Sequence, residues 1–411
     1  MSSVAVPPQA LKVLILSQWY PPEPQSVVSD LAESLAAQGH AVQVLTGFPN
    51  WPSGRLYPGY RLRLFRREIW NGVAVTRVPL FPYHGRSPLG RVANLASFCL
   101  SALIAGPFLM RRPDIVHAIQ PPTTCFPAWA LSCIWRVPFT YEVQDLWPDT
   151  LQATGMVGGR GALSLVARYC RWAYRKARRI RVISQGFRRH LIERGVPASK
   201  IEVIPNWVDT VRYRPTGERT PTEPGTFRIM YAGNLGLAQG LDNVLDAAAL
   251  LPAESGVRFV LVGDGVEADT LRARCASMRL TNVEFTGRKA PEEMKGILAE
   301  ADAVLLHLKP DALFSVTIPS KLLTYFAVGK PILSCAAGEP TDLVTHAAAG
   351  IGCAPGDPRA LTDAAQKMAG LSAEERRQMG HAGRLFALAH FERGSVVSDI
   401  GKMLRRATAE A

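Results

Sequence analysis

The sequence predicts an α/β protein made of two doubly wound parallel-sheet domains that face each other across a cleft. Its 411 residues exceed what one hydrophobic core usually organises, so two domains of roughly 200 residues are expected. Strand-like and helix-length segments alternate in both halves, and a linker-like stretch at 215–225 separates them. We expect domains at residues 1–210 and 211–390, with a helix at 391–411 that could cross back to the first domain.

The first half starts with a strand, a helix and a second strand. Residues 11–19 have a buried-strand pattern, an amphipathic helix then ends at Gly39, and residues 41–46 form the next strand. Further strands are expected at 73–78, 114–119, 138–143, 179–184 and 200–205.

The second half repeats this alternation. Its apolar strands are expected at 227–233, 258–263, 283–287, 302–308 and 331–336. Such an order is typical of a parallel sheet with helices on both faces. The chain after residue 358 is expected to be helical.

Residues 317–332 carry the strongest local signal for a binding site. Pro319 suits a first helical turn and Gly329 can take the left-handed conformation that ends a helix, so a helix should begin near Ser320. Its free N–H groups would carry partial positive charge, to which Ser320 and Lys321 add a hydroxyl donor and an ammonium group. The stretch predicts a phosphate site, although an ordinary capped helix fits the same residues.

The net charge of +13 is concentrated in the first half. Residues 1–210 contain 24 basic and 11 acidic side chains, whereas residues 211–411 contain 23 of each. A basic half predicts a polyanionic partner, either nucleic acid or an anionic membrane surface, unless it is a solvated face. Several arginines in this half follow helical spacing and form either a solvated face or a surface that meets phosphates. They are Arg168, Arg171, Arg175 and Arg178.

Two apolar segments favour the membrane as the partner. Residues 94–110 are apolar without forming a full span and are flanked by arginines, so they could lie in the headgroup region. Residues 125–135 include Trp129 and Trp135, whose rings favour that depth. Either segment could instead be a buried helix. The seven scattered cysteines lack the spacing of a zinc site or a disulfide framework and fit a reducing cytosol.

A nicotinamide-dependent dehydrogenase is disfavoured by the loop after the first strand. Residues 20–23 (YPPE) stand where a dinucleotide site needs GxGxxG, and residues 263–265 (GDG) are only a weak match.

Taken in order, the motifs resemble those of the retaining glycosyltransferases of family four, which have the two-domain GT-B fold, and especially its colanic-acid and O-antigen fucosyl or fucosamine transferases. The resemblance extends over nearly the full length. The matching segments are 20–23 (YPPE), 39–40 (GH), 44–46 (VLT), 47–50 (GFPN), 145–149 (DLWPD), 206–209 (NWVD), 231–234 (YAGN), 263–265 (GDG) and 329–331 (GKP).

This resemblance implies a UDP- or GDP-linked sugar donor in the second half, an acceptor in the first half, and neither a metal nor another cofactor. Protein groups must then neutralise the leaving diphosphate. Much of the family has an Arg and a Lys where this chain has Asn234 and Gln239, so Lys321 is the candidate replacement. The expected donor-site residues are Gly233, Asn234, Gln239, Gly263, Asp264, Arg288, Lys309, Pro319, Ser320, Lys321, Thr324 and Glu339.

Four of these positions have further alternatives. Thr324 stands where the family usually has its ribose-binding glutamate, and Glu339 is a candidate substitute. Arg288 and Lys309 are reserve cations whose alternative role is plain surface charge.

The acceptor site is expected at the strand ends of the first half. Asp145 follows the strand at 138–143 where related enzymes place a His-Asp pair, with Gln144 replacing the histidine. A carboxylate there could orient or deprotonate the acceptor hydroxyl, unless it caps the next segment. Glu23, Gln25 and His117 are expected to border the acceptor pocket.

The resemblance therefore implies a retaining, metal-independent bacterial glycosyltransferase, with Asp145 and Lys321 as the expected catalytic residues. It would act in the cytoplasm, at the inner face of the plasma membrane, on a polyprenyl-diphosphate-linked glycan in surface polysaccharide synthesis, with a fucose- or fucosamine-type sugar as one option. The alternatives are a sugar-nucleotide epimerase of the same fold and a basic nucleic-acid-binding protein. The latter is disfavoured because no nucleic-acid module is recognised.

Overall fold

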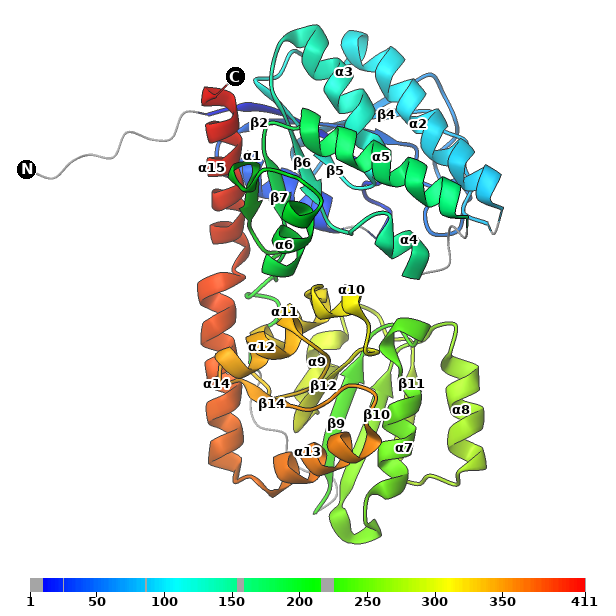
Figure 1. Cartoon of the computed structure of the whole chain (residues 1–411), viewed down its shortest axis with the longest axis vertical. Coiled ribbons are helices and arrows are strands. Elements are labelled where there is room, and N and C mark those ends of the chain that lie inside the picture. The colour runs from blue at the N-terminus through cyan, green and yellow to red at the C-terminus, as the bar shows by residue number, and fades with distance from the viewer. Residues whose placement is uncertain (1–9, 25, 86, 154–158, 216–224, 411) are drawn as a thin grey trace, which may run out of the picture. The chain divides into compact units, whose positions relative to one another are not determined.

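The chain forms two compact units in the computed structural model, which describes residues 10–24, 26–85, 87–153, 159–215 and 225–410. The first unit comprises Met1–Ile183, Phe187–Ile204 and Gly394–Ala411, and the second comprises Ser184–Gly186 and Pro205–Arg393 (Figure 1). Each unit contains one sheet, so the predicted architecture of two α/β domains is confirmed.

The first unit contains an eight-stranded sheet in the order β3-β4-β2-β1-β5-β6-β7-β8. The strands are β1 Lys12–Leu16, β2 Ala41–Gly47, β3 Arg66–Trp70, β4 Val73–Val78, β5 Ile115–Ile119, β6 Phe139–Val143, β7 Ile180–Val182 and β8 Ile201–Val203. The sheet is parallel, as predicted, except at one edge, where β3 pairs antiparallel with β4. Asn71 and Gly72 both have positive φ and make the tight turn between them, which the sequence analysis missed.

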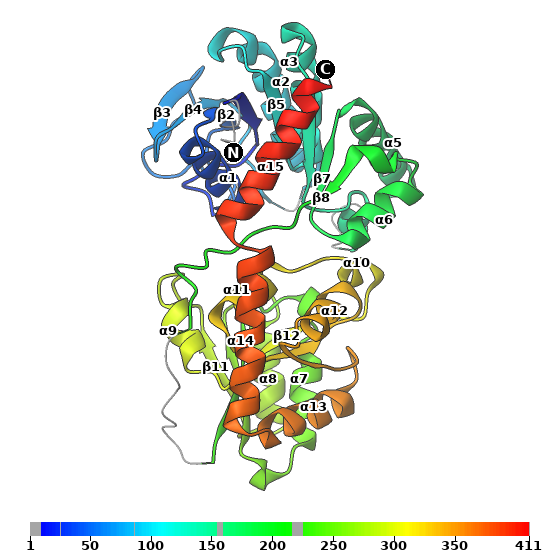
Figure 2. The same ribbon diagram turned by 90° about the vertical axis from the view of Figure 1, so that its left-hand side faces the viewer.

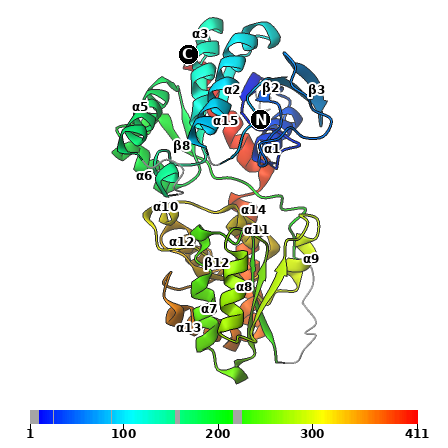
Figure 3. The same cartoon turned by 90° about the vertical axis from the view of Figure 1, so that its right-hand side faces the viewer.

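Helices cover both sides of this sheet. They are α1 Ser26–Ala37, α2 Pro88–Leu109, α3 Cys125–Trp135, α4 Asp149–Ala153, α5 Arg160–Lys176, α6 Gln185–Glu193 and α15 Arg393–Ala409. Figures 2 and 3 show α15 on one side and α2 with α3 on the other. The C-terminal helix α15 belongs to the first unit, where Arg406 pairs with Glu202 and Gln38 donates to the Gly394 carbonyl.

The second unit contains six parallel strands in the order β11-β10-β9-β12-β13-β14. They are β9 Phe227–Ala232, β10 Val257–Val262, β11 Val283–Gly287, β12 Ala303–His307, β13 Ile332–Cys335 and β14 Gly350–Gly352. The sequence analysis missed β14, because three residues with two glycines carry no apolar pattern.

Two apolar cores lie on the two faces of this second sheet. One includes side chains from α7, α8 and α13, and the other includes side chains from α9, α11, α12 and α14. The helices are α7 Asp242–Leu250, α8 Ala268–Ser277, α9 Met294–Ala299, α10 Ala312–Ser315, α11 Ser320–Val328, α12 Glu339–His346, α13 Pro358–Gly370 and α14 Ala373–His390. This packing fixes the strand ends from which the loops of the candidate site emerge.

Candidate active site

A cavity of about 450 Å³ lies at the carboxyl ends of β9, β10 and β11 in the second unit. Parallel strands place the loops that follow them at one edge of the sheet, where ligands of such folds bind. Five of the predicted donor-site residues line it together with Lys289 and Met294. These five are Gly233, Asn234, Gly263, Asp264 and Arg288.

Two glycines set the shape of this cavity. Gly233 and Gly263 have φ values of 147° and 138°, which side-chain-bearing residues rarely adopt. A Cβ on Gly263 would lie 1.8 Å from the Gly233 carbonyl oxygen, and one on Gly233 would lie 2.8 Å from Lys321 Nζ. The close approach of the two loops and of Lys321 therefore depends on both glycines.

Lys321 extends from the first turn of α11 toward the end of β9. Its Nζ donates to the Tyr231 hydroxyl and lies 3.9 Å from the centre of the Tyr231 ring. The same hydroxyl donates to the Asn234 carbonyl oxygen at 2.7 Å. Tyr231 thus holds the ammonium group beside Gly233, which lines the cavity.

The Lys321 ammonium group has no carboxylate partner in the part of the chain that the structure describes. Burial lowers the pKa of Lys321 to about 7. The helix begins at Ser320, as predicted, so its N-terminal N–H groups add partial positive charge near this lysine. An anionic ligand at this position would stabilise the protonated amine.

The affinity for an anionic nucleotide sugar should therefore fall as the pH rises through about 7, because the free protein loses the Lys321 proton. Above that pH we expect roughly a tenfold loss per unit until the bound amine also titrates. Lys321→Arg keeps its charge and should bind with little pH dependence between pH 6 and 9. Equilibrium titrations across this range measure both curves, and identical slopes would contradict the role of the lysine.

The other donor-site candidates lie on the same edge but differ in their contacts. Gln239 Oε1 accepts from the Gly236 N–H at 3.1 Å, so its side chain closes its own loop. Lys309 is exposed. His307, which the sequence analysis missed, donates from Nδ1 to the Gln239 carbonyl at 2.6 Å and accepts at Nε2 from Asn243, while burial lowers its pKa.

The remaining candidates flank α11. Pro319 is the N-cap residue in an extended conformation, Ser320 is exposed, and Thr324 is half-buried one turn later. Glu339 is the first residue of α12, directly after Gly338. Gln25 lies outside the described residues.

Asp145 lies two residues beyond the end of β6 in the first unit. Its backbone N–H and that of Gln144 both donate to Gln120 Oε1 at 2.6 Å, and Gln120 Nε2 donates to the Asp145 carbonyl at 3.2 Å. Asp145 is exposed, and its carboxylate makes no hydrogen bond or ion pair within the described ranges. Asp145 is thus held by its backbone and is not a helix cap, which leaves its carboxylate available to a substrate.

Two family models match the chain in tandem. Residues 24–207 match the model described as "Glycosyl transferase 4-like domain", and residues 226–370 match "Glycosyl transferases group 1". The chain is a GT-B glycosyltransferase. The cavity and Lys321 beside it lie in the region matched by the second model, and Asp145 lies in the region matched by the first.

Relatives and solved structures agree with this assignment. The glycosyltransferase is 29% identical, over 78% of its chain and 82% of the relative, to "Putative colanic acid biosynthesis glycosyl transferase WcaI" of Escherichia coli strain K12. It is 26% identical, over 82% of both chains, to the GDP-mannose-dependent alpha-mannosyltransferase of Mycobacterium tuberculosis. The fold matches that of HepE from Anabaena in complex with UDP with a TM-score of 0.70 and 19% identity, over 96% of this chain and 100% of that chain.

Glu23 is buried and joins two loops of the first unit of this glycosyltransferase, although the sequence analysis expected it at the border of the acceptor pocket. Its carboxylate is buried and accepts from the backbone N–H groups of Tyr20 at 3.0 Å, Asn50 at 2.8 Å and Trp51 at 2.8 Å. Burial raises the pKa of Glu23 to about 7, against these donors, which favour the carboxylate. Glu23 thus joins the loop after β1 to the loop after β2.

Glu23→Ala should destabilise the first unit because three N–H groups lose their acceptor. The expected loss is on the order of 3 kcal/mol, which corresponds to a thermal midpoint lower by roughly 10 °C. Calorimetry of the purified protein measures this change. Glu23→Gln keeps one acceptor oxygen and should lose less; equal midpoints for wild type and Glu23→Ala would contradict the role.

His117 is also corrected, because it lies at the centre of β5 and is fully buried. Its Nδ1 hydrogen-bonds with Thr140 Oγ1 at 2.9 Å, and its Nε2 lies 3.2 Å from Glu142 Oε2. Burial alone would raise the pKa of Glu142, but Arg181 at 2.7 Å and the bonds from His117 and Gln144 lower it to about 2. His117 is therefore fully buried in a network with Thr140, Glu142 and Arg181 and cannot contact an acceptor.

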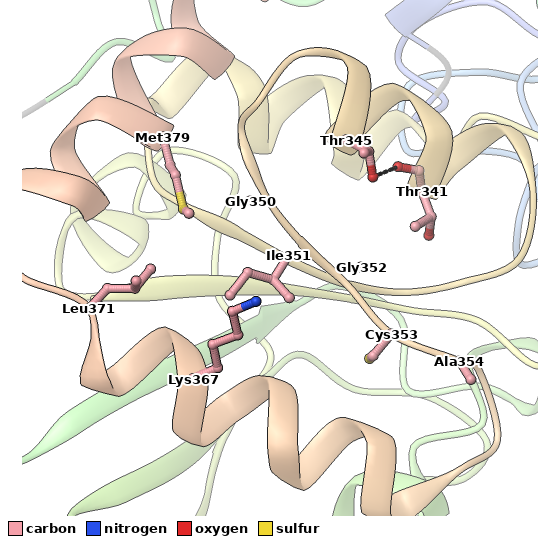
Figure 4. Close-up of a pocket in the computed structure, with 10 residues that line it drawn as sticks. All are labelled: Thr341, Thr345, Gly350, Ile351, Gly352, Cys353, Ala354, Lys367, Leu371 and Met379. Carbon is pink, nitrogen blue, oxygen red and sulfur yellow. Dashed lines mark hydrogen bonds between the residues drawn. The ribbon is translucent and has the colours of Figure 1, made fainter.

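A larger cavity, of about 570 Å³, lies beside β14 in the second unit (Figure 4). Thr341, Cys353, Lys367 and Met379 are among its lining residues, and none of the predicted donor-site residues is. It is therefore separate from the candidate active site.

Proposed function

We propose that this glycosyltransferase transfers a sugar, with retention of anomeric configuration, from a UDP- or GDP-linked donor to a lipid-linked glycan precursor of a bacterial surface polysaccharide. The observation that carries the proposal is the Lys321 ammonium group, which has no carboxylate partner in the described chain and lies beside the cavity of the second unit. A departing diphosphate needs positive charge at such a place.

The relatives support the two substrate classes. HepE structures contain UDP and UDP-glucose, and the mycobacterial relative is named for GDP-mannose. WcaI and AmsK of Erwinia amylovora are named for the biosynthesis of the polysaccharides colanic acid and amylovoran.

The roles follow from the chemistry of the residues. Lys321 and the N-terminus of α11 stabilise the negative charge that develops on the leaving diphosphate, so we propose that no metal is required. Asp145 orients the acceptor hydroxyl or removes its proton. Gln120 positions Asp145 through the backbone bonds described above.

A transfer assay tests the proposal. Thermal-shift screening against UDP, GDP and dTDP sugars selects the donor, and a polyprenyl-diphosphate-linked sugar serves as acceptor. The predicted product carries the new sugar with the anomeric configuration of the donor, as read by NMR. Conversion of the donor without any acceptor would identify an epimerase instead.

The surface of α2 supports a membrane-bound acceptor. One side of this helix packs on the unit through Asn94, Phe98, Ala102 and Gly106. Its other side exposes large apolar side chains, with Leu89 at 81% and Phe108 at 84% exposure. Among the described residues α2 is the one helix long and apolar enough to span a membrane, with a mean hydropathy of 1.8. Because one stripe is packed on protein, we propose that α2 lies along the inner face of the plasma membrane in the cytoplasm.

Vesicle flotation tests this orientation. Leu100→Ser with Ile104→Ser removes exposed apolar area from α2 and should lower the vesicle-bound fraction several-fold. The matched control is Leu385→Ser with Leu388→Ser, two exposed leucines of α14, which should bind like wild type. Equal loss in both pairs, or loss in neither, would contradict the proposed surface.

A further inference from the structure

A small cavity of about 230 Å³ in the first unit is lined by four arginines. We call it the arginine pocket, defined by Arg168, Arg171 and Arg175 of α5 and by Arg194 after α6. Tyr174, Val196 and Pro197 add apolar surface. Its volume is below the range of about 300–1,000 Å³ typical of drug-sized ligands, so it suits a small group.

The positive charges of three of these arginines have no acidic partner among the described residues. Arg168, Arg171 and Arg175 are exposed, and their guanidinium groups make no hydrogen bond or ion pair with any residue that the structure describes. Their spacing of three and four residues places them on one face of α5, where like charges destabilise a helix. The helix itself contains no acidic residue.

The fourth arginine is fixed in place. Arg194 Nη2 donates to both carboxylate oxygens of Asp149, at 2.8 and 2.6 Å, and Nη1 donates to the Trp147 carbonyl at 3.1 Å. Asp149 also lies 3.3 Å from His190 Nε2, so it is fully engaged. No acidic side chain is among the described residues that line the pocket.

Other arginines of the first unit have acidic partners that neutralise their charge. Arg77 pairs with Glu68, Arg179 with Glu202 and Glu410, and Arg181 with Glu142. Favourable interaction with the helix dipole accounts for Arg175 in the last turn of α5, but that effect falls off within one turn and does not reach Arg168. A bound anion would supply the missing counter-charge for all three exposed arginines.

We propose that the arginine pocket binds a phosphate or diphosphate group, at a site separate from the donor cavity of the second unit. A guanidinium group can donate hydrogen bonds to two phosphate oxygens at once. The bonds to Asp149 and to the Trp147 carbonyl hold Arg194 in one position. The group can belong to a lipid headgroup, including that of a lipid-linked glycan, or to free pyrophosphate. The proposal is independent of the donor site and of the acceptor's identity.

Calorimetry with inorganic pyrophosphate tests the shared chemistry. All proteins carry Lys321→Ala to weaken binding in the second unit. R168Q/R171Q/R175Q should bind pyrophosphate at least tenfold more weakly than the Lys321→Ala parent does. Added salt should lower the affinity of the parent for pyrophosphate. The control R178Q/R188Q/R189Q removes the same charge from arginines of the first unit that do not line the pocket and should stay within twofold. Circular dichroism verifies that both variants fold.

Vesicles distinguish the source of the anion. The same proteins are floated with phosphatidylcholine vesicles with and without phosphatidylglycerol. If R168Q/R171Q/R175Q loses pyrophosphate binding and the control does not, the site is supported. If R168Q/R171Q/R175Q loses binding to anionic vesicles but keeps pyrophosphate binding, the bound group is a lipid headgroup. A parent that binds neither probe, or equal behaviour of the two triple variants with both probes, would overturn the proposal.

Discussion

Lys321→Ala is expected to lower the rate of sugar transfer by about 10²–10³-fold, the range seen when one preorganised charge-stabilising donor is removed. The reason is geometric: Tyr231 holds the ammonium group beside Gly233, and no carboxylate in the described chain competes for it. Initial rates at saturating donor and acceptor measure the effect.

The control for this change is Lys367→Ala, an exposed lysine of α13 that lines the separate cavity of the second unit. It removes the same charge and should retain the wild-type rate. Lys321→Arg should recover part of the activity because its charge persists, although its larger planar guanidinium cannot occupy the same position as the compact ammonium group. A Lys321→Ala enzyme with a near-normal rate would exclude the proposed role.

Asp145→Asn is expected to lower the rate by about 10²–10³-fold, within the range that general acid–base groups contribute. The amide has almost the same shape, and the backbone clamp from Gln120 does not involve the side chain, so folding should be unaffected. Because the donor cavity lies in the other unit, the KM for the donor should change little while kcat falls.

Glu193→Gln provides the matched control, since it neutralises an exposed carboxylate at the end of α6 in the same unit. Its kcat should equal that of wild type. An Asp145→Asn enzyme with full kcat would show that this carboxylate neither orients nor deprotonates the acceptor.

Helix boundaries could be predicted from the sequence where the residues at the boundary themselves determine it. The helix at Ser320–Val328 begins and ends as expected because Pro319 and Gly329 are its own boundary signals. The edge strands β3 and β14 were missed because one is charged and half-exposed and the other has only three residues. Their existence depends on neighbouring strands that a local pattern does not contain.

The sequence predicted which residues belong to the donor site better than it predicted the contacts between them. Loops at strand ends brought Gly233, Gly263 and Arg288 together because parallel topology alone requires it. The contact of Lys321 with Tyr231 joins residues 90 positions apart. His117 was misplaced because the end of β5 lies two residues later, and Glu23 was misread because its partners lie on another loop.

The most direct test of the diphosphate site is the number of protons taken up when the selected nucleotide sugar binds at pH 8, measured by calorimetry in buffers of different ionisation enthalpy. A lysine whose pKa is about 7 in the free protein is mostly neutral at that pH and must regain its proton beside a diphosphate. We predict an uptake approaching one proton in wild type and none in Lys321→Ala. Binding without proton uptake in wild type, or the same uptake in both proteins, would contradict the account.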